Sequence, residues 1–171
     1  MIEKRSVLLL TIALGAACAS QRPEPQPVFA EIPRGSPLSF QYQLADGKGV
    51  LTSQVLRGRS TVIAFLTTYD LASQAQARFL SGLMRKHELI NIAAIVLEPP
   101  DNRPLIVAFR DALELEYPVA LGDASLIAGH GPFGDVRSVP STVVLDSEGR
   151  LVWRHVGLSK QEDIENVLRG L

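Results

Sequence analysis

The chain has 171 residues, of which 46% are hydrophobic and 20% are charged, and its formal net charge at pH 7 is −1. This is the composition of an ordinary globular protein, and the balanced charge gives no electrostatic bias toward nucleic acid or another acidic partner. We therefore expect no nucleic-acid partner.

The first residues have the pattern of a secretory signal. Lys4 and Arg5 precede an apolar run over residues 7–14, and small residues follow at positions 15–17. A charged start, an apolar segment of this length and a small-residue exit are typical of a signal peptide, and the run is too short to span a bilayer as a mature helix. We assign residues 1–17 to a signal peptide and expect an exported protein.

Cys18 is the only cysteine of the chain and directly follows these small residues. It has no partner for an internal disulfide, and oxidising compartments disfavour stray thiols. The stretch from Leu14 to Cys18 resembles a bacterial lipoprotein lipobox, which implies that Cys18 is acylated and anchors a periplasm-facing protein in the cell envelope. Ala19 and Ser20 lack the aspartate that retains enterobacterial lipoproteins in the inner membrane, which favours the outer membrane. The alternative is a plain signal peptide, cut nearby, with an incidental cysteine.

Residues 18–36 are expected to form a spacer behind the lipid. The segment carries four prolines separated mostly by polar residues, at positions 23, 25, 27 and 33. Closely spaced prolines disfavour both a helix and a strand ladder, so the segment is predicted to be a semi-extended tether. The remaining residues, 37–171, are enough for one domain with a proper core but not for two.

The folded part opens with a predicted β-hairpin. Residues 38–44 alternate apolar and polar side chains, and the turn sequence at 45–49 returns the chain along residues 50–51. Residues 52–59 have the pattern of a short, capped helical turn that ends at Gly58.

A buried strand and an amphipathic helix form the central unit. Thr61–Leu66 carries no charge and is mostly β-branched or aromatic, which predicts a strand covered on both faces. A helix is predicted over residues 71–88, with one apolar face made by Phe79, Leu80, Leu83 and Met84. The junction from Thr67 to Ser73 then lies where open α/β sheets gather unpaired backbone N–H groups and the positive end of a helix dipole.

The second half of the chain continues this α/β pattern. Residues 91–97 are a second apolar run, which predicts a parallel strand reached by a right-handed crossover. A helix is predicted from Pro104, with Leu105, Phe109, Ala112 and Leu113 on one face. An extended piece at 117–121, a helical turn at 123–128 and a glycine-rich loop at 129–134 follow.

The last predicted elements are a β-hairpin and a helix. Residues 138–146 and 151–157 are joined by a turn sequence and should pair antiparallel. Ser159 is predicted to cap the final helix, with Glu162 completing a capping box. The inward face of this helix should consist of Ile164, Val167 and Leu168.

Four landmarks in this order carry a resemblance to a known superfamily. They are residues 46–49 (Asp-Gly-Lys-Gly), 65–69 (Phe-Leu-Thr-Thr-Tyr), 136–142 (Val-Arg-Ser-Val-Pro-Ser-Thr) and 145–150 (Leu-Asp-Ser-Glu-Gly-Arg). With them the chain resembles the thioredoxin-like superfamily, specifically its TlpA/ResA-type and redoxin-type exported domains. The resemblance implies a three-layer α/β/α sandwich with a mixed central sheet over residues 37–171, and a cis-proline loop at Val139–Pro140.

The active-site turn departs from that superfamily. Where the family has Trp-Cys-x-x-Cys, the alignment places Asp70 and Ser73, and in the peroxiredoxin pattern Thr-x-x-Cys, Thr67 matches the threonine while Asp70 again replaces the cysteine. Thiol exchange needs a thiolate nucleophile and a resolving sulfur, and neither a carboxylate nor a hydroxyl forms the mixed disulfide. We infer a degenerate site in which the catalytic cysteines are absent.

The same residues allow two other chemistries to be considered at this site. The fold implies that Asp70, Ser73, His130 and Pro140 converge, which leaves open a Ser-His-Asp hydrolase or a metal bound by Asp70 and His130. Both are disfavoured, because Ser73 one turn into a helix should face solvent or cap, and copper would want soft sulfur ligands. We expect no metal and no cofactor, and we interpret Asp70 as a helix cap.

Two functional hypotheses follow. In the first, the chain is a membrane-tethered, redox-inactive module that binds an envelope protein or peptide in a groove beside Pro140. The binding residues would be Thr68, Tyr69, Asp70, Ser73, Val139 and Pro140. The alternative is an enzyme: either a thiol–disulfide oxidoreductase or peroxiredoxin-family protein that acts in envelope redox homeostasis through a partner's cysteines, or a non-cysteine activity at Asp70.

Overall fold

The computed structural model of the protein describes residues 35–171. The signal peptide predicted at 1–17, the acylated Cys18 and nearly all of the predicted tether at 18–36 lie outside the described residues. Within the described part of the chain, no helix has both the length and the apolar character needed to cross a bilayer.

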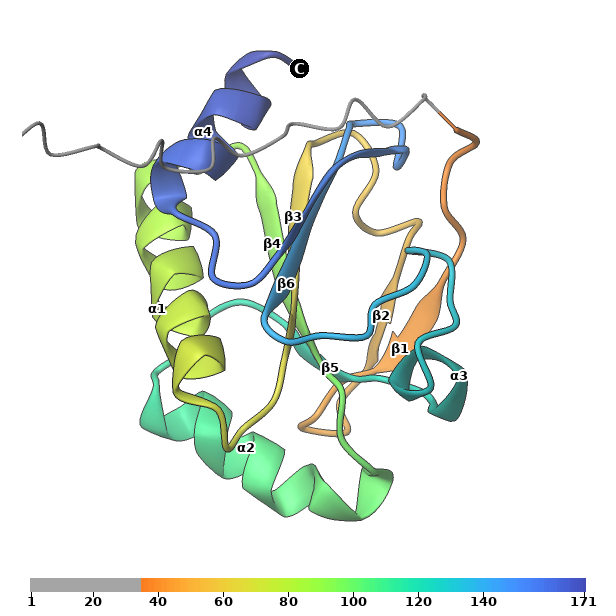
Figure 1. Ribbon diagram of the computed structural model, residues 1–171, viewed down its shortest axis with the longest axis vertical. Coiled ribbons are helices and arrows are strands. Elements are labelled where there is room, and N and C mark those ends of the chain that lie inside the picture. Colours follow the sequence, from red (N-terminus) through yellow and green to blue (C-terminus); the bar gives the residue numbers. More distant parts are fainter. Residues whose placement is uncertain (1–34) are drawn as a thin grey trace, which may run out of the picture.

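A five-stranded mixed sheet lies at the centre of the molecule (Figure 1). Its strand order is β5-β4-β3-β6-β7, with β3, β4 and β5 parallel and β6 and β7 antiparallel to their neighbours. The predicted parallel crossover and the predicted C-terminal hairpin are therefore confirmed. The strands span Thr61–Leu66 (β3), Asn91–Val96 (β4), Val119–Leu121 (β5), Ser141–Leu145 (β6) and Leu151–Val156 (β7).

Three helices cover one face of the sheet, and a hairpin with a short helix covers the other (Figure 1). On β3, Val62, Ala64 and Leu66 face the three helices, whereas Ile63 and Phe65 face the hairpin. This is why the run has no polar alternation: both of its faces are buried. The helical side consists of α1 (Leu71–Lys86), α2 (Arg103–Ala112, preceded by the 3-10 turn Pro100–Asn102) and α4 (Gln161–Arg169), and the other side of β1 (Gln41–Gln43), β2 (Val50–Thr52) and α3 (Ala124–Ile127).

Two helix faces differ from the prediction. Phe79 is 41% exposed, while Leu80 and Leu83 are fully buried, and on α2 the buried residue is Ile106 rather than its neighbour Leu105. The inward face of α1 includes small and polar residues such as Ser73, Gln76 and Ser81. An apolar pattern alone therefore shifted the predicted face, because large apolar residues do not mark the whole buried stripe.

The capped turn predicted at 52–59 forms, although as hydrogen-bonded turns and not as a helix, whereas the cap predicted at Ser159 is wrong. Residues 53–58 are the turns: Thr52 Oγ1 accepts from the N–H of Val55 at 3.4 Å, and Gly58 adopts a φ of 88° while its N–H bonds to the carbonyl of Ser147. Helix α4 begins after Lys160, without a side-chain cap, because Ser159 is fully buried and its hydroxyl lies 2.8 Å from Thr142 Oγ1. Tertiary hydrogen bonds thus displaced the local capping pattern.

Glu165 joins α4 to the end of α1 and gives the fold a pH-dependent component. Its carboxylate accepts hydrogen bonds from Lys86 (2.7 Å) and Gln161 (2.8 Å) and lies 3.2 Å from His87 Nε2. These contacts, led by Lys86, lower the pKa of Glu165 to about 2. A carboxyl with a depressed folded-state pKa stabilises the fold above its unfolded-state value of 4.5 and loses that contribution as the pH falls toward about 2.

We therefore expect the difference in unfolding free energy between the parent chain and Glu165→Gln to shrink as the pH is lowered from 5 toward 2, as measured by urea denaturation at each pH. A difference that stays constant over that range would contradict the assignment. Glu162→Gln, a change in the exposed first turn of the same helix, is the matched control.

Candidate functional site

The candidate site lies at the end of the sheet where β3 and β7 finish and β6 begins. Phe65 pairs with Ser141, and Ser141 pairs with Val156, so Pro140 lies next to the end of β3. Gly157 N–H donates to the Pro140 carbonyl at 2.8 Å, and the Val139–Pro140 peptide bond is cis. The chain after β3, the proline loop and the end of β7 therefore meet at one edge.

Asp70 is the N-cap of α1. Its backbone is extended (φ −101°, ψ 126°), and its carboxylate accepts from the N–H groups of Ala72 (3.3 Å) and Ser73 (2.8 Å). Hydrogen bonding from Ser73 is the main reason that the pKa of Asp70 is lowered from its usual value. The expected capping role is confirmed, and it commits the carboxylate to the helix.

Ser73 is buried rather than solvent-facing, so that expectation was wrong. Its side chain is fully inaccessible, and its Oγ accepts a hydrogen bond from the N–H of Thr67 at 3.2 Å. This contact folds the segment after β3 back onto the first turn of α1. A hydroxyl in this position is a structural acceptor, and substrate has no access to it.

His130 does not join this group. Its N–H donates to the Ser125 carbonyl and its carbonyl accepts from Ser125 Oγ, which holds it at the end of α3. Figure 1 shows α3 beside the β1–β2 hairpin, on the other side of the sheet from α1. The structure therefore assembles neither the Ser-His-Asp arrangement nor an Asp70–His130 metal site. Across residues 35–171, no group of three or more potential ligands from His, Cys, Asp and Glu is placed to hold a metal ion.

Exposed apolar side chains surround the same end of the sheet. Tyr69 and Leu71 are 77% and 78% exposed, and Val156 and Leu158 are also exposed at the end of β7. Val139, which precedes Pro140, is partly buried. We call these five residues the apolar rim: Tyr69, Leu71, Val139, Val156 and Leu158.

Comparison with known proteins bears on this arrangement. No protein-family model matches the chain. In sequence it is similar to the thiol-disulfide oxidoreductase ResA of Bacillus cereus, at 21% identity over 114 residues, or 67% of this chain. The matched region spans 64% of the length of that relative.

Solved structures share the architecture of the described residues. A DsbF homologue from Corynebacterium diphtheriae matches 88% of this chain and 96% of its own with a TM-score of 0.72 and 14% identity. A thioredoxin family thiol:disulfide interchange protein from Chlorobium tepidum TLS matches 82% and 98% with a TM-score of 0.68 and 18% identity. A putative protein disulfide isomerase from Bacteroides thetaiotaomicron matches 83% and 89% with a TM-score of 0.65 and 20% identity.

The chain has a thioredoxin-like fold. The predicted three-layer sandwich with a mixed central sheet is confirmed, and the relatives found by sequence and by structure include thiol–disulfide oxidoreductases. The assignment of the lost cysteines to Asp70 and Ser73 stays a prediction from the sequence motif.

Glu98 is a residue of the candidate site that the sequence did not point to. It follows β4, is only 2% exposed, and accepts hydrogen bonds from Thr68 N–H and from Asn102 Nδ2, the latter at 2.8 Å. The carboxylate thus ties the segment after β3 to the start of α2. The available signal was its position: an acidic residue directly after a buried strand, at the same sheet end as Asp70.

Glu98→Ala is expected to destabilise the fold by about 1–3 kcal/mol, because the Thr68 N–H and the Asn102 amide lose their acceptor. Urea denaturation followed by circular dichroism measures this. Glu98→Gln, which keeps one carbonyl acceptor, should cost clearly less, and equal losses for the two variants would contradict the role of the carboxylate as acceptor.

A buried polar cluster lies behind α1. Gln76 is fully buried and accepts from Ser159 N–H at 2.8 Å, and Ser159 Oγ lies near both Gln76 Oε1 and Thr142 Oγ1. Within the described residues, Gln76 Nε2 and Thr67 Oγ1 are buried without a partner. The cluster joins α1, β6 and the loop before α4, and none of its members is exposed enough to bind a partner.

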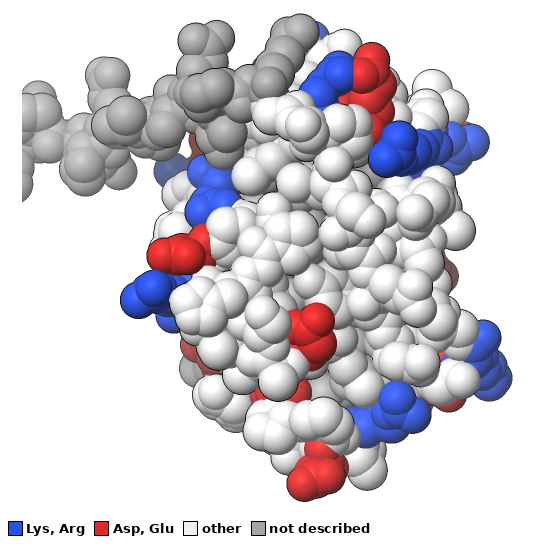
Figure 2. Space-filling view, turned by 90° about the vertical axis from the view of Figure 1, so that its right-hand side faces the viewer, with Lys and Arg blue, Asp and Glu red and all other residues white. Residues whose placement is uncertain are grey.

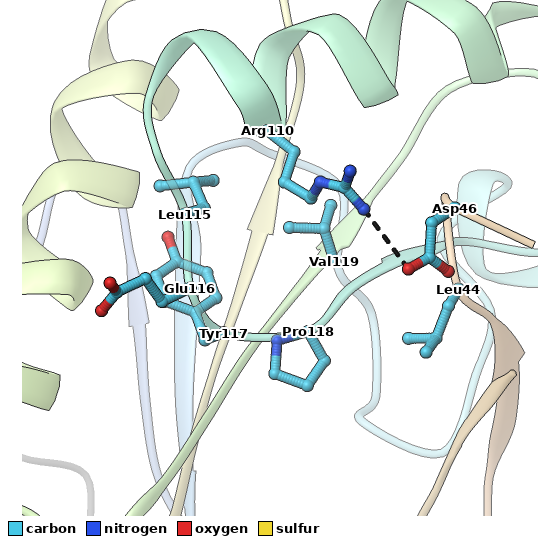
Figure 3. A pocket seen from close by; sticks show the side chains of 8 residues that line it. All are labelled: Leu44, Asp46, Arg110, Leu115, Glu116, Tyr117, Pro118 and Val119. Carbon is cyan, nitrogen blue, oxygen red and sulfur yellow. Dashed lines mark ion pairs between the residues drawn. The ribbon is translucent and has the colours of Figure 1, made fainter. Parts of the chain in front are cut away.

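The pocket in Figure 3 lies away from the rim, at the start of β5. It has a volume of about 280 Å³, and across its mouth Arg110 pairs with Asp46 at 3.4 Å. This ion pair neutralises two of the three charged side chains that line the pocket, and the carboxylate of the third, Glu116, points away from the pair in Figure 3. The lining residues are Leu44, Asp46, Arg110, Leu115, Glu116, Tyr117, Pro118 and Val119.

The face of the molecule in Figure 2 is mostly uncharged: one acidic side chain lies near its middle, and the other acidic and basic side chains are scattered toward its margins. Neither sign of charge gathers into a continuous patch on this face. This agrees with the balanced net charge of −1.

Proposed function

We propose that the chain is a lipid-anchored envelope protein whose thioredoxin-like domain binds a protein or peptide partner and performs no thiol chemistry of its own. One observation carries the proposal: Asp70 and Ser73, which the motif alignment assigns to the positions of the active-site cysteines, both have side chains committed to internal hydrogen bonds. No cysteine occurs between residues 35 and 171. Without a thiolate the domain has no nucleophile for disulfide exchange.

The apolar rim supports the binding half of the proposal. Tyr69 and Leu71 are large and strongly exposed apolar side chains, and clusters of such side chains mark interaction sites. Thr68 and the backbone of Val139 lie at the same sheet end, where an extended peptide could form strand-like hydrogen bonds. Asp70, Ser73 and Pro140 shape this surface from beneath.

The location in the envelope rests on the amino terminus. The signal-like residues 1–17 and the lipobox-like context of Cys18 support export and acylation, and the absence of aspartate after Cys18 favours the outer membrane. One protein of similar fold, with a TM-score of 0.63 and 16% identity, is described as a secreted disulfide oxidoreductase from Mycobacterium tuberculosis.

Two measurements on the full chain test the proposal. Insulin reduction and peroxide consumption should not exceed those of a thioredoxin whose two active-site cysteines are replaced, and turnover above that background would overturn redox inactivity. A photo-crosslinker at position 73 should capture nothing because the site is buried, whereas one at position 69 should capture an envelope protein.

That capture should be lost on Leu71→Ala and kept on Val55→Ala, an apolar control that is 68% exposed and follows β2. If capture is lost with both variants, or kept with both, the apolar rim is not the binding surface.

A second candidate is disulfide exchange in which a partner supplies both sulfurs. The sequence similarity to a thiol-disulfide oxidoreductase favours it. It predicts that the full chain accelerates exchange between two thiol-containing partners while remaining inactive alone, a behaviour that simple binding does not produce.

A further inference from the structure

The outer edge of β7 is open along its whole length in the described part of the chain. β7 pairs with β6 on one side and with no described strand on the other. It contains no proline, and the register irregularity of this hairpin, between Val144 and Leu145, lies at the far end from the rim. Open edges of this kind are templates for another strand unless a protein blunts them.

The opposite edge of the same sheet, formed by β5, is covered by other parts of the chain. β5 has only three residues, and its free side is bridged by Leu44 against Ala120. Ala45 N–H also donates to the Val119 carbonyl at 2.8 Å. The fold protects one edge of the sheet and leaves the other available.

The hydrogen-bonding groups that β7 offers can be assigned. Gly157 N–H bonds to Pro140, so in the antiparallel pattern His155 and Trp153 also face β6. The N–H and C=O groups of Arg154 and Val156 therefore point outward. The two side chains lie on the same face of the sheet because their positions differ by two.

Arg154 adds a chemical preference to this edge. Its guanidinium lies against Gly134, where an added Cβ would be 2.5 Å from Nη2, and its Nε is buried without a hydrogen-bond partner among residues 35–171. Among those residues it also takes part in no ion pair. A partly desolvated guanidinium without an acceptor favours a carboxylate, which it can bind through two parallel hydrogen bonds.

We propose that the edge of β7 adds an extended segment of a partner protein in antiparallel pairing, with an Asp or Glu opposite Arg154 and an apolar residue opposite Val156. The partner would carry the pattern apolar-x-acidic, read toward its carboxyl end. Val156 belongs both to this edge and to the apolar rim, so one extended segment could contact both. The inference rests on the proposed function in one respect, namely that the segment belongs to a protein partner.

Two synthetic peptides on the ¹⁵N-labelled full chain test this inference. One is acetyl-Thr-Val-Thr-Glu-Thr-Val-Thr-amide, and the other has Lys in place of Glu. The Glu peptide should shift and protect the amides of Arg154 and Val156 and bind about ten-fold more tightly than the Lys peptide. Arg154→Glu should reverse that order, and Arg154→Gln should abolish the preference while keeping edge binding. Arg137→Glu, which alters an exposed arginine shortly before Pro140, is the control: it should change neither the binding to the edge nor the preference for the Glu peptide.

Several results would overturn the inference. These are no shift at Arg154 and Val156 with millimolar peptide, equal binding of the two peptides, or edge amides that are already protected without peptide. Protection that depends on protein concentration would assign the edge to a second copy, and protection that does not would assign it to residues 1–34. Leu71→Ala separates the two proposals, because it should abolish capture by the crosslinker at position 69 and leave peptide binding to β7 intact.

Discussion

Replacing Asp70 and Ser73 together by cysteine is expected to give the domain an intramolecular disulfide and measurable insulin reduction. The two residues are the N-cap and the third residue of α1, and they already touch, with Asp70 Oδ2 2.8 Å from Ser73 N. Side chains three positions apart at a helix start are close enough for disulfide geometry. The helix amino terminus would lower the thiol pKa at position 70 and favour its thiolate.

The variant is best made with Cys18→Ser, so that the introduced pair supplies the only thiols. Thiol titration before and after reduction counts them, and mass spectrometry shows the loss of two hydrogen atoms on oxidation. Each single cysteine variant should stay reduced and inactive. A double variant that keeps two free thiols under oxidising conditions would show that positions 70 and 73 are not the lost cysteine positions, and the proposed function would lose its main support.

The sheet could be predicted because its strands carry their signal in their own residues. Thr61–Leu66 is apolar throughout since helices cover one face and the hairpin the other, and its predicted bounds are those of β3. The strand at 91–96 was recognisable for the same reason. In both cases burial on two faces leaves a continuous apolar run, which does not depend on knowing the neighbours.

The buried polar contacts could not be predicted from local sequence, because the hydrogen-bond partners are set by the tertiary fold. Ser159 has the local pattern of a helix cap, but Gln76, 83 positions away, takes its N–H. Ser73 was expected to face solvent or cap the helix, but it is buried and its hydroxyl accepts a hydrogen bond from the N–H of Thr67. Local propensity favours one partner for each hydroxyl, and the fold supplies a better one that is distant in sequence.

The site itself was predictable only in part. The motif alignment located Asp70 and Pro140 at one sheet end, but it included His130, which the glycine-rich loop leaves beside α3. It also omitted Glu98, whose role depends on β4 ending next to β3. The position of His130 and the role of Glu98 both depend on which elements are neighbours in the fold, and separation along the chain does not reveal this.

Phe133→Ala is expected to have the largest effect on stability of the substitutions considered, about 3–5 kcal/mol. Phe133 is fully buried, and its ring centroid lies 4.9 Å from that of Phe40, 5.1 Å from Phe65 and 6.4 Å from Tyr42. It is the residue by which the glycine-rich loop is fixed to the hairpin side of the core. Its removal leaves a cavity and three aromatic rings without their common neighbour.

Phe79→Ala is the matched control, because the same side chain is removed where it is 41% exposed on α1, and the expected loss in urea denaturation is much smaller. If the two variants cost the same, the aromatic cluster does not stabilise the domain as its geometry implies. The comparison also bears on the site, since the loop that Phe133 fixes leads directly to Val139 and Pro140. Phe133→Ala should therefore weaken capture at the rim even at a temperature where the domain remains folded, whereas Phe79→Ala should not.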